Sequence, residues 1–339
     1  MSAVDGPLAG KSVLVTGADG FIGSHLVEAA LDAGATVRAF CFYNSTGSAG
    51  WLDHSETFRR ACQDGQAELA LGDIRDPALV DASVQGVEVV LHLAALIAIP
   101  YSYAAPRSYV ETNVTGTLNV LEAVRRHGTP RMVNTSTSEV YGTPETVPIT
   151  ESHAVRGQSP YSATKIAADK LCESFALSFE TPVVTLRPFN TYGPRQSLRA
   201  VIPTVLGQLL AGATELRLGS VTPQRDFTYV IDTCDGFLRA ATADLAPGET
   251  VQLGTGSTYS VAEVVERCMA VTGQQATIVT DQERVRPGAS EVKVLLSDPS
   301  RARERLGWEP RTGLDAGLAS TAAWLREHLD PRTIHRYAR

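Results

Sequence analysis

Residues 12–26 read SVLVTGADGFIGSHL, and they set the architecture of the chain. A short apolar run is typical of a buried strand, and Gly17, Gly20 and Gly23 follow it directly. A tight turn from strand to helix needs a residue that tolerates unusual backbone angles, as glycine does. A pyrophosphate can then approach the backbone, where the helix N-terminus offers N–H groups and a positive dipole. The stretch therefore predicts a dinucleotide site, because strand, glycine turn and helix occur together.

The alternation of strands and helices continues outward from this turn. Further strands are predicted at residues 36–40, 68–74, 87–95 and 131–137. Helices are predicted at residues 21–34 and 109–128. Strands that alternate with helices of ten or more residues indicate βαβ units and a parallel sheet. The crossovers should be right-handed, and a ligand should lie at the carboxyl ends of the strands.

The second half of the chain has a different rhythm, because turn-rich pieces interrupt shorter helices after about residue 191. We therefore expect an α/β fold, in which a doubly wound Rossmann parallel sheet carries a smaller C-terminal substrate-binding lobe. The predicted NAD-binding domain covers residues 1–190 and 228–256, and the predicted lobe covers residues 191–227 and 257–339.

Two further segments bear on the dinucleotide. An acid is expected about 20 residues after the glycines, at the end of the second strand, to hold the ribose hydroxyls. Residues 38–45 read RAFCFYNS and supply no acid, nor an arginine following closely for a 2′-phosphate, so NAD is favoured over NADP. Asp73 and Ile74, after the third strand, are candidates to hydrogen-bond and sandwich the adenine. The alternative for the aspartate is a simple loop cap.

A catalytic constellation is predicted from two later segments. Tyr161 and Lys165 are four residues apart in SPYSATK, so on a helix they share one face. A lysine ammonium beside a phenol favours the phenolate, which can take a proton from a substrate hydroxyl while hydride leaves for the nicotinamide. Taken alone, this spacing also fits an ordinary surface helix. With the polar run after the fifth strand, the predicted catalytic residues are Thr137, Ser138, Glu139, Tyr161 and Lys165.

These motifs resemble the extended short-chain dehydrogenase/reductase family, in its sugar-nucleotide epimerase/dehydratase branch. The matching segments span nearly the whole chain and are TGADGFIGSHL, GDIRD, HLAA, ETNVTGT, TSTSEVYG, SPYSATK, RPFNTYGPRQ, QRDFTYV and LGWEP. The resemblance implies NAD as the cofactor, a nucleotide-diphosphate sugar as the substrate, and a homodimer packed through the helices beginning near Arg107 and Tyr161.

The resemblance also assigns roles to individual residues. Beyond the three glycines, Asp73 and Ile74, the implied NAD contacts are Phe21, Ile22, Leu93, Ala94, Ala95, Asn113, Tyr161, Lys165 and Pro188. The implied substrate contacts are Asn190, Arg195, Arg225 and Arg286. Arginine suits a diphosphate because its guanidinium binds phosphate through two hydrogen bonds. The alternative for each arginine is a surface ion pair.

The branch contains C4 epimerases, 4,6-dehydratases and decarboxylases. A 4,6-dehydratase must remove the C5 proton and protonate the departing C6 hydroxyl, and Glu139 stands where the family carries that carboxyl group. The dTDP-glucose dehydratases have Asp where this chain has Ser138, which disfavours dTDP-glucose. Residues 43–53, 157–171, 187–204 and 286–292 look most like the NDP-N-acetylglucosamine 4,6-dehydratases of legionaminic-type pathways.

The expected function is therefore NAD-dependent 4,6-dehydration of an NDP-hexose, with NDP-N-acetylglucosamine as the expected substrate. An NDP-sugar C4 epimerase and a UDP-glucuronate decarboxylase remain alternatives, because a Thr-Ser-Glu order also occurs in the decarboxylases. A catalytically silent NAD-binding scaffold or sensor is the alternative outside the enzymes, and the intact Thr137, Tyr161 and Lys165 count against it.

Composition narrows the remaining possibilities. The net charge of −7 argues against a nucleic-acid partner, which would require a clustered basic face. The most apolar stretch, residues 87–100, is too short to span a bilayer, and the N-terminus has no apolar signal segment. The five cysteines have no metal-ligand or redox spacing. We expect a cytoplasmic protein that has no metal and no membrane partner.

Overall fold

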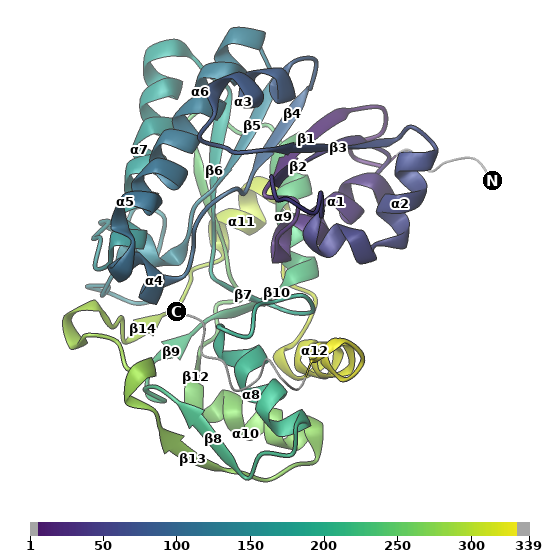
Figure 1. Cartoon of the computed structure of the whole chain (residues 1–339). Coiled ribbons are helices and arrows are strands. Elements are labelled where there is room, and N and C mark those ends of the chain that lie inside the picture. The colour runs from purple at the N-terminus through teal and green to yellow at the C-terminus, as the bar shows by residue number, and fades with distance from the viewer. Residues whose placement is uncertain (1–5, 331–339) are drawn as a thin grey trace.

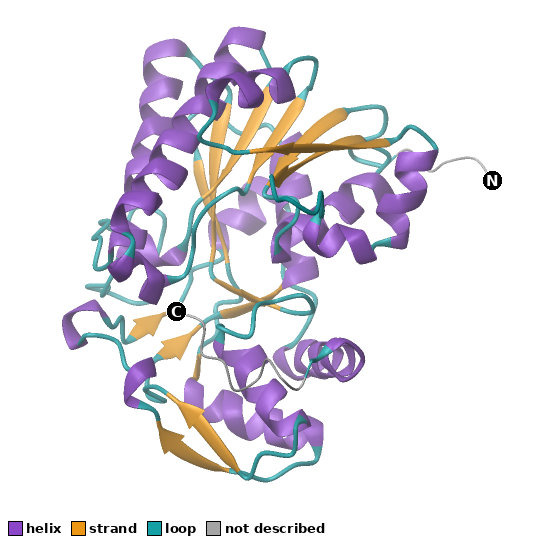
Figure 2. Ribbon diagram, in the orientation of Figure 1, coloured by secondary structure: helices purple, strands orange, loops and turns teal. Residues whose placement is uncertain are grey.

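The structure is a computed structural model that describes residues 6–330, and a seven-stranded sheet lies at its centre (Figures 1 and 2). The strands are β1 (Ser12–Thr16), β2 (Thr36–Phe42), β3 (Ala67–Gly72), β4 (Val89–His92), β5 (Arg131–Thr135), β6 (Val183–Pro188) and β11 (Thr250–Leu253). Their order is β11-β6-β5-β4-β1-β2-β3, and every neighbouring pair is parallel. The predicted Rossmann architecture is confirmed.

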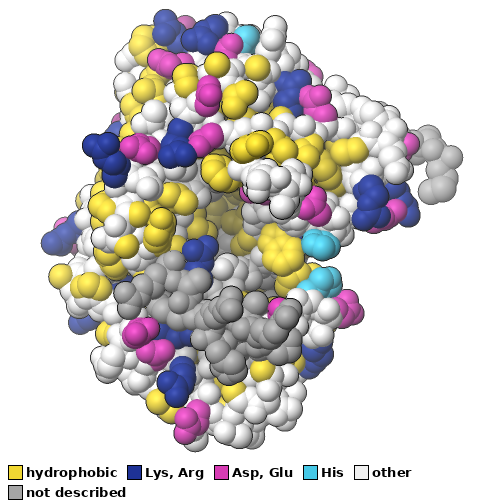
Figure 3. Space-filling view, in the orientation of Figure 1, with side chains coloured by type: hydrophobic (Ala, Val, Ile, Leu, Met, Phe, Trp, Pro, Cys, Tyr) yellow, Lys and Arg dark blue, Asp and Glu magenta, His cyan; other side chains and the backbone are white. Residues whose placement is uncertain are grey.

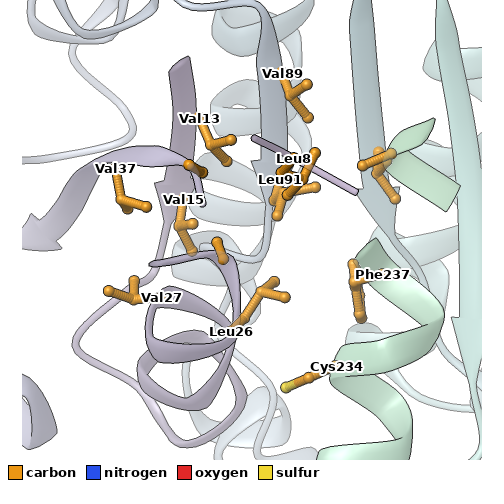
Figure 4. Close-up of a cluster of buried hydrophobic side chains, with 14 of the residues drawn as sticks. Leu8, Val13, Val15, Leu26, Val27, Val37, Val89, Leu91, Cys234 and Phe237 are labelled. Carbon is orange, nitrogen blue, oxygen red and sulfur yellow. The ribbon is translucent and has the colours of Figure 1, made fainter. Parts of the chain in front are cut away.

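Helices cover both faces of this sheet. They are α1 (Phe21–Asp32), α2 (Glu56–Gln63), α9 (Val230–Thr242) and α11 (Ser300–Leu306) on one face, and α3 (Pro77–Val84), α6 (Gly116–His127) and α7 (Pro160–Phe179) on the other. Successive side chains of a strand point to opposite faces. Val13 and Val15 therefore pack with Leu26 and Phe237 (Figure 4), whereas Leu14 packs on the α6 side. Burying each such side chain contributes roughly 1.5–3 kcal/mol.

The strand order reverses between β1 and β4. The chain moves outward from β1 through β2 to β3, and then returns to β4 on the other side of β1. In open α/β sheets this switch point forms a crevice at the carboxyl ends of the strands, where ligands bind. The glycine turn that follows β1 and the HLAA segment that ends β4 meet there.

Several predicted elements differ at their ends from the observed ones. Residues 73–74, 93–95 and 136–137, predicted within strands, lie beyond the observed strand ends. The predicted helix at residues 109–128 is two segments, because the π-helical turn η2 (Val110–Thr115) precedes α6. That helix does end at Gly128, which has a φ of 63°. The hydrophobic pattern of a sequence does not indicate which residue makes the last hydrogen bond of a strand. It also does not indicate a helical turn that contains one extra residue.

The remaining elements form the part of the molecule below the sheet in Figure 1. They are β7 (Asn190–Tyr192), α8 (Val201–Leu210), β8 (Glu215–Leu218), β9 (Gln224–Arg225), β10 (Phe227–Tyr229), β12 (Tyr259–Ser260), α10 (Val261–Thr272), β13 (Thr277–Thr280), β14 (Val294–Leu295) and α12 (Leu314–His328). They enclose a core of their own around α8, α10 and α12. The parallel pair β7–β10 joins this lobe to the sheet.

The predicted domain boundaries stay a prediction, and two observations bear on them. Strand β11 lies beside β6 at the edge of the sheet, within the predicted NAD-binding range. Ala302, Leu306 and Trp308 fall within the predicted lobe, yet all three are buried in the core between the sheet and α9. The apolar face of α11 therefore packs on the Rossmann part of the molecule.

The packing of the glycine turn gives a stability prediction. A Cβ on Gly23 would lie 2.0 Å from the carbonyl oxygen of Gly17, which is rigid backbone. We expect Gly23→Ala to lower the free energy of unfolding by about 1–3 kcal/mol, measured by urea denaturation. Gly288→Ala is the control, because nothing lies within 4 Å of a Cβ built there. Equal stabilities of the two variants would show that the turn tolerates a side chain.

Candidate active site

The glycine turn has the shape and polarity that a pyrophosphate requires. Gly17 has a φ of 69°, and a Cβ on it would lie 2.9 Å from the backbone of Ala94. Helix α1 begins after Gly20 with Phe21 and Ile22, without a side-chain cap or an acid in its first turn. Its first N–H groups therefore point at the crevice and can bind an anion. The residues present fit a dinucleotide.

A buried histidine organises the chain on the far side of the crevice. The Thr16 hydroxyl accepts the backbone N–H groups of Leu93 and Ala94, each at 3.1 Å. Its own proton is then free for Nδ1 of His92, 2.8 Å away, and Nε2 lies 3.1 Å from the Thr117 hydroxyl. Burial, and to a lesser extent the charge of Lys165, lowers the pKa of His92 to about 3. His92 is therefore neutral and holds the start of the predicted cofactor segment, Leu93 to Ala95.

Asn113 connects this segment to the catalytic helix. It lies in the π-helical turn η2, and its amide exchanges hydrogen bonds with the backbone N and O of Leu96 at 2.8 and 2.9 Å. The same amide donates to Thr164 Oγ1 at 3.0 Å, and Thr164 in turn donates to the carbonyl of Tyr161. Asn113 therefore lies beside the Tyr161–Lys165 pair.

The candidate adenine residues are already engaged. Both carboxylate oxygens of Asp73 accept hydrogen bonds from Arg75 Nε, at 2.9 and 3.0 Å. This contact lowers the pKa of Asp73. Ile74 is buried against Gly116 of α6, and its carbonyl accepts from Asn119. Their assignment to adenine stays a prediction.

Helix α7 presents the two residues on which the predicted chemistry rests. Ser159 and Ser162 form a capping box, and Pro160 occupies the first turn, where its missing N–H costs nothing. The helix therefore starts just before Tyr161, and both Tyr161 and Lys165 are buried, with exposed fractions of 8% and 4%. The start of the helix thus fixes where both side chains enter the site.

The electrostatics of Tyr161 differ from the expectation. Burial raises its pKa above the usual value, the hydrogen bond with Thr137 lowers it, and the charge of Glu139 raises it further. Lys165, from which a lowering was expected, is not among the groups with the largest effect on the Tyr161 pKa, and burial lowers the pKa of Lys165 itself. Thr137 therefore lies at the phenol, and Glu139 is near enough for its charge to act on it. Thr137 caps the short helix η3 (Ser138–Tyr141), in which Ser138 is buried.

A buried ion pair between Asp169 and Arg187 lies near Lys165, and neither residue is among the predicted site residues. Asp169 accepts hydrogen bonds from Ser136 Oγ at 2.7 Å and from Arg187 Nε and Nη2 at 3.1 and 3.0 Å. Burial lowers the pKa of Lys165, and the carboxylate of Asp169 counteracts this. The signal was present in the sequence, because Asp169 continues the four-residue spacing of Tyr161 and Lys165 on one helix face.

Two predicted arginines converge from the lobe on the same carboxylate. Glu291 lies 3.3 Å from Arg225 Nη2 and 3.6 Å from Arg286 Nη1. The charge of Glu139 also acts on Arg225 and raises its pKa, although burial lowers it overall. Within residues 6–330, Arg286 Nη1 and Asn190 Oδ1 are buried without a hydrogen-bond partner. Two guanidinium groups suit an anionic ligand, and the orphaned amide oxygen can accept a hydrogen bond from a hydroxyl or N–H group of that ligand. Pro188 is buried at the end of β6, two residues before Asn190 in the sequence.

Arg195 is already engaged by another part of the chain. Its guanidinium makes two hydrogen bonds, of 2.8 and 2.9 Å, to the carboxylate of Glu28 in α1 and a third to Ser24. Arg195 has a φ of 67°, in the left-handed region, which directs the loop after β7 across α1. The side chain therefore ties the lobe to the Rossmann part, and its assignment to the substrate stays a prediction. The sequence pattern could not show a partner 167 residues away.

Residues 6–330 show neither a metal centre nor a membrane-spanning helix. This part of the chain holds no cluster of three or more metal-ligating side chains. No helix there is both long and apolar enough to cross a membrane. All five cysteines are free thiols. Figure 3 shows the molecule hollowed between the sheet and the lobe, with apolar side chains gathered around the hollow.

A parallel sheet with a glycine turn at its switch point, and a Tyr–Lys pair beside it, defines an NAD-binding enzyme of the short-chain dehydrogenase/reductase type. The family model described as GDP-mannose 4,6 dehydratase matches residues 14–321, and the chain belongs to this family of NAD-dependent nucleotide-sugar dehydratases and epimerases.

Relatives of both reaction types match nearly the whole chain. A dTDP-glucose 4,6-dehydratase from Xanthomonas campestris is 34% identical over 92% of each chain. A UDP-glucose 4-epimerase from Mycolicibacterium smegmatis is 32% identical, covering 92% of this chain and 98% of the relative. The crystal structure of a dTDP-glucose 4,6-dehydratase from Streptomyces venezuelae, with NAD bound, has a TM-score of 0.82 and 28% identity, covering 93% and 97% of the two chains. NAD is the cofactor of the family.

The buried His92 gives a prediction about pH. Its folded pKa of about 3 lies below the ordinary value of 6.5, so the unfolded chain binds the extra proton between these values. Above pH 6.5 the histidine is neutral in both states, and its burial costs no protonation energy. As the pH falls toward 3, protonation of the unfolded chain lowers the free energy of unfolding. We expect the stability advantage of the native protein over His92→Asn to shrink by about 1.4 kcal/mol per pH unit below 6.5, measured by urea denaturation. Parallel stability curves for the two proteins would contradict a neutral His92.

Proposed function

We propose that the protein catalyses the NAD-dependent 4,6-dehydration of an NDP-hexose to the 4-keto-6-deoxy sugar nucleotide. The position of Glu139 supports this most, because its charge acts on both Tyr161 and Arg225. Glu139 stands in η3, which begins directly after Thr137, so its carboxylate can serve a sugar that is held by Tyr161 at one end and by a lobe arginine at its diphosphate. A C4 epimerase has no use for a base at that point, since the Tyr–Lys pair and Thr137 suffice for its chemistry.

Each side chain has a distinct task in the proposed mechanism. NAD, when bound, supplies the acceptor for the C4 hydride and returns that hydride to C6. Tyr161, aligned by Thr137, takes the proton from the C4 hydroxyl, and the charges of Lys165 and the cofactor stabilise its phenolate. Glu139 removes the C5 proton, which the 4-ketone makes acidic, and protonates the C6 hydroxyl as water leaves. Ser138 donates a hydrogen bond to that oxygen. As hydride returns to C6, a proton equivalent to the one that Tyr161 took is delivered to C5, so that one water is lost in all and both Tyr161 and the cofactor end unchanged.

The lobe binds the nucleotide end of the substrate. Arg225 and Arg286 hold the diphosphate, with Asn190 beside it, and Glu291 gives up part of its contact with the two guanidinium groups. NDP-N-acetylglucosamine is the proposed hexose, on the resemblance of residues 43–53 and 286–292 to enzymes acting on it. A C4 epimerase is the second candidate, since relatives of that activity match the chain at similar identity. The homodimer also remains a proposal.

Substrate and reaction are tested together by mass spectrometry. The protein is incubated with the UDP, GDP and dTDP forms of N-acetylglucosamine and glucose, and with UDP-glucuronate. We expect a product lighter than its substrate by one water, with the N-acetylglucosamine form turned over fastest. A product of unchanged mass and altered chromatography would establish the epimerase, and loss of carbon dioxide from the glucuronate would establish the decarboxylase.

The role of Glu139 gives a sharper prediction. Glu139→Gln should reduce dehydration by roughly 10²–10⁴-fold, because one general acid/base is lost. Oxidation at C4 should continue, so the absorbance of reduced nicotinamide should rise on mixing with substrate. Glu145→Gln, an exposed glutamate of the following loop, is the matched control. Near-full dehydration by Glu139→Gln would refute the assigned role.

A further inference from the structure

The end of β2 lacks the acid that usually holds the adenosine ribose of NAD. Phe42 and Tyr43 occupy that position, and both are exposed. Asn44 follows, but its amide is used by the loop itself. Its Oδ1 accepts from Thr46 and Ser48, and its Nδ2 donates to two carbonyl groups. A ribose-binding carboxylate therefore has to come from another segment.

Asp19 lies at this position, although it belongs to the glycine turn. The ladder between β1 and β2 continues past the end of β1, because the N–H of Ala18 donates to the carbonyl of Phe40 at 3.2 Å. Asp19 therefore comes opposite the last residue of β2, and its carboxylate faces the N–H of Phe42. The side chain is only partly buried, so part of it stays accessible.

The loop after β2 holds Asp19 in place. The N–H of Trp51 donates to the carbonyl of Asp19 at 3.2 Å. Gly50, with a φ of 61°, packs so closely that a Cβ on it would lie 2.5 Å from that carbonyl oxygen. Trp51 is itself packed edge-to-face on Trp324 of the lobe, with ring centroids 5.2 Å apart. The backbone of Asp19 is thus fixed from both parts of the molecule.

Two acids, Asp19 and Asp53, lie near Cys41 at the end of β2. Burial raises the pKa of the neighbouring Cys41 to about 12, and the charges of Asp19 and Asp53 contribute in the same direction. The carboxylate of Asp53 is bonded to the Ser48 hydroxyl at 2.5 Å and to the N–H of Ala49 at 3.1 Å, whereas that of Asp19 meets backbone N–H groups alone, its own and that of Phe42, and keeps lone pairs for a further donor. Asp19 is therefore the acid at the end of β2 that is placed to receive a ligand.

We propose that the Asp19 carboxylate accepts the hydroxyl groups of the adenosine ribose of NAD and excludes NADP. Two ribose hydroxyls can donate to the two carboxylate oxygens, and hydrogen bonds to a charged acceptor are strong. A 2′-phosphate removes one of the two hydroxyl donors. It also places a charge of about −2 next to the carboxylate, which repels it. The selectivity thus comes from the glycine turn, whichever sugar reaction the enzyme catalyses.

The test measures which nucleotide is bound rather than turnover. Native protein and the variants Asp19→Asn and Asp19→Ser are equilibrated with an equimolar mixture of NAD and NADP. The bound nucleotides are then released by denaturation and quantified by mass spectrometry. We expect the native protein to hold NAD, and the bound ratio of NAD to NADP to fall about 10–100-fold in both variants, as loss of charge-assisted hydrogen bonds implies. Circular dichroism confirms that each variant is folded.

Asp53→Asn is the matched control, because it removes the same charge from the same neighbourhood. It should leave the ratio of bound nucleotides unchanged. The proposal is overturned if the Asp19 variants keep the native ratio, or if Asp53→Asn lowers that ratio equally. A protein that dehydrates no sugar nucleotide yet shows the expected ratios would refute the proposed reaction and leave this inference standing.

Discussion

Burying the ammonium group of Lys165 is the constraint on which the catalytic part of the structure depends. A charge removed from water needs an opposite charge nearby, and the carboxylate of Asp169, one helical turn further along α7 and paired with Arg187, acts on Lys165 in that sense. That carboxylate is in turn held by Arg187 of β6 and by Ser136 beyond β5. Breaking such a buried pair costs several kcal/mol, typically about 3–5. The network therefore fixes α7 against the ends of two strands, and Tyr161 with it.

The same site combines a rigid half with an adjustable half. The Rossmann part holds its residues by backbone contacts and buried neutral groups such as His92. The lobe instead offers charges, because Arg225 and Arg286 share Glu291 at distances beyond an ideal hydrogen bond. A diphosphate can compete for these arginines without breaking the core. Dehydration and epimerisation share the first half of this chemistry, which is why relatives of both kinds resemble the chain so closely.

Most of the fold could be predicted from sequence, because its signals are local. The glycine turn, the strand–helix alternation and the Tyr161–Lys165 spacing each lie within a few consecutive residues. The contacts that the sequence missed join distant segments, as Asp169 joins Arg187 and as Arg195 joins Glu28. The missing ribose acid shows the same limit. A count of residues from the glycines pointed to the end of β2, whereas the carboxylate there comes from Asp19 in the turn itself.

The proposed reaction moves one hydrogen from C4 to C6 of the same sugar, and an isotope can follow it. The measurement is mass spectrometry and NMR of the product formed from NDP-N-acetylglucosamine that carries deuterium at C4. We expect a product lighter by one water that retains the deuterium at C6. An isomer of unchanged mass with deuterium still at C4 would instead mean that the protein is an epimerase, and that Glu139 does not act at C5.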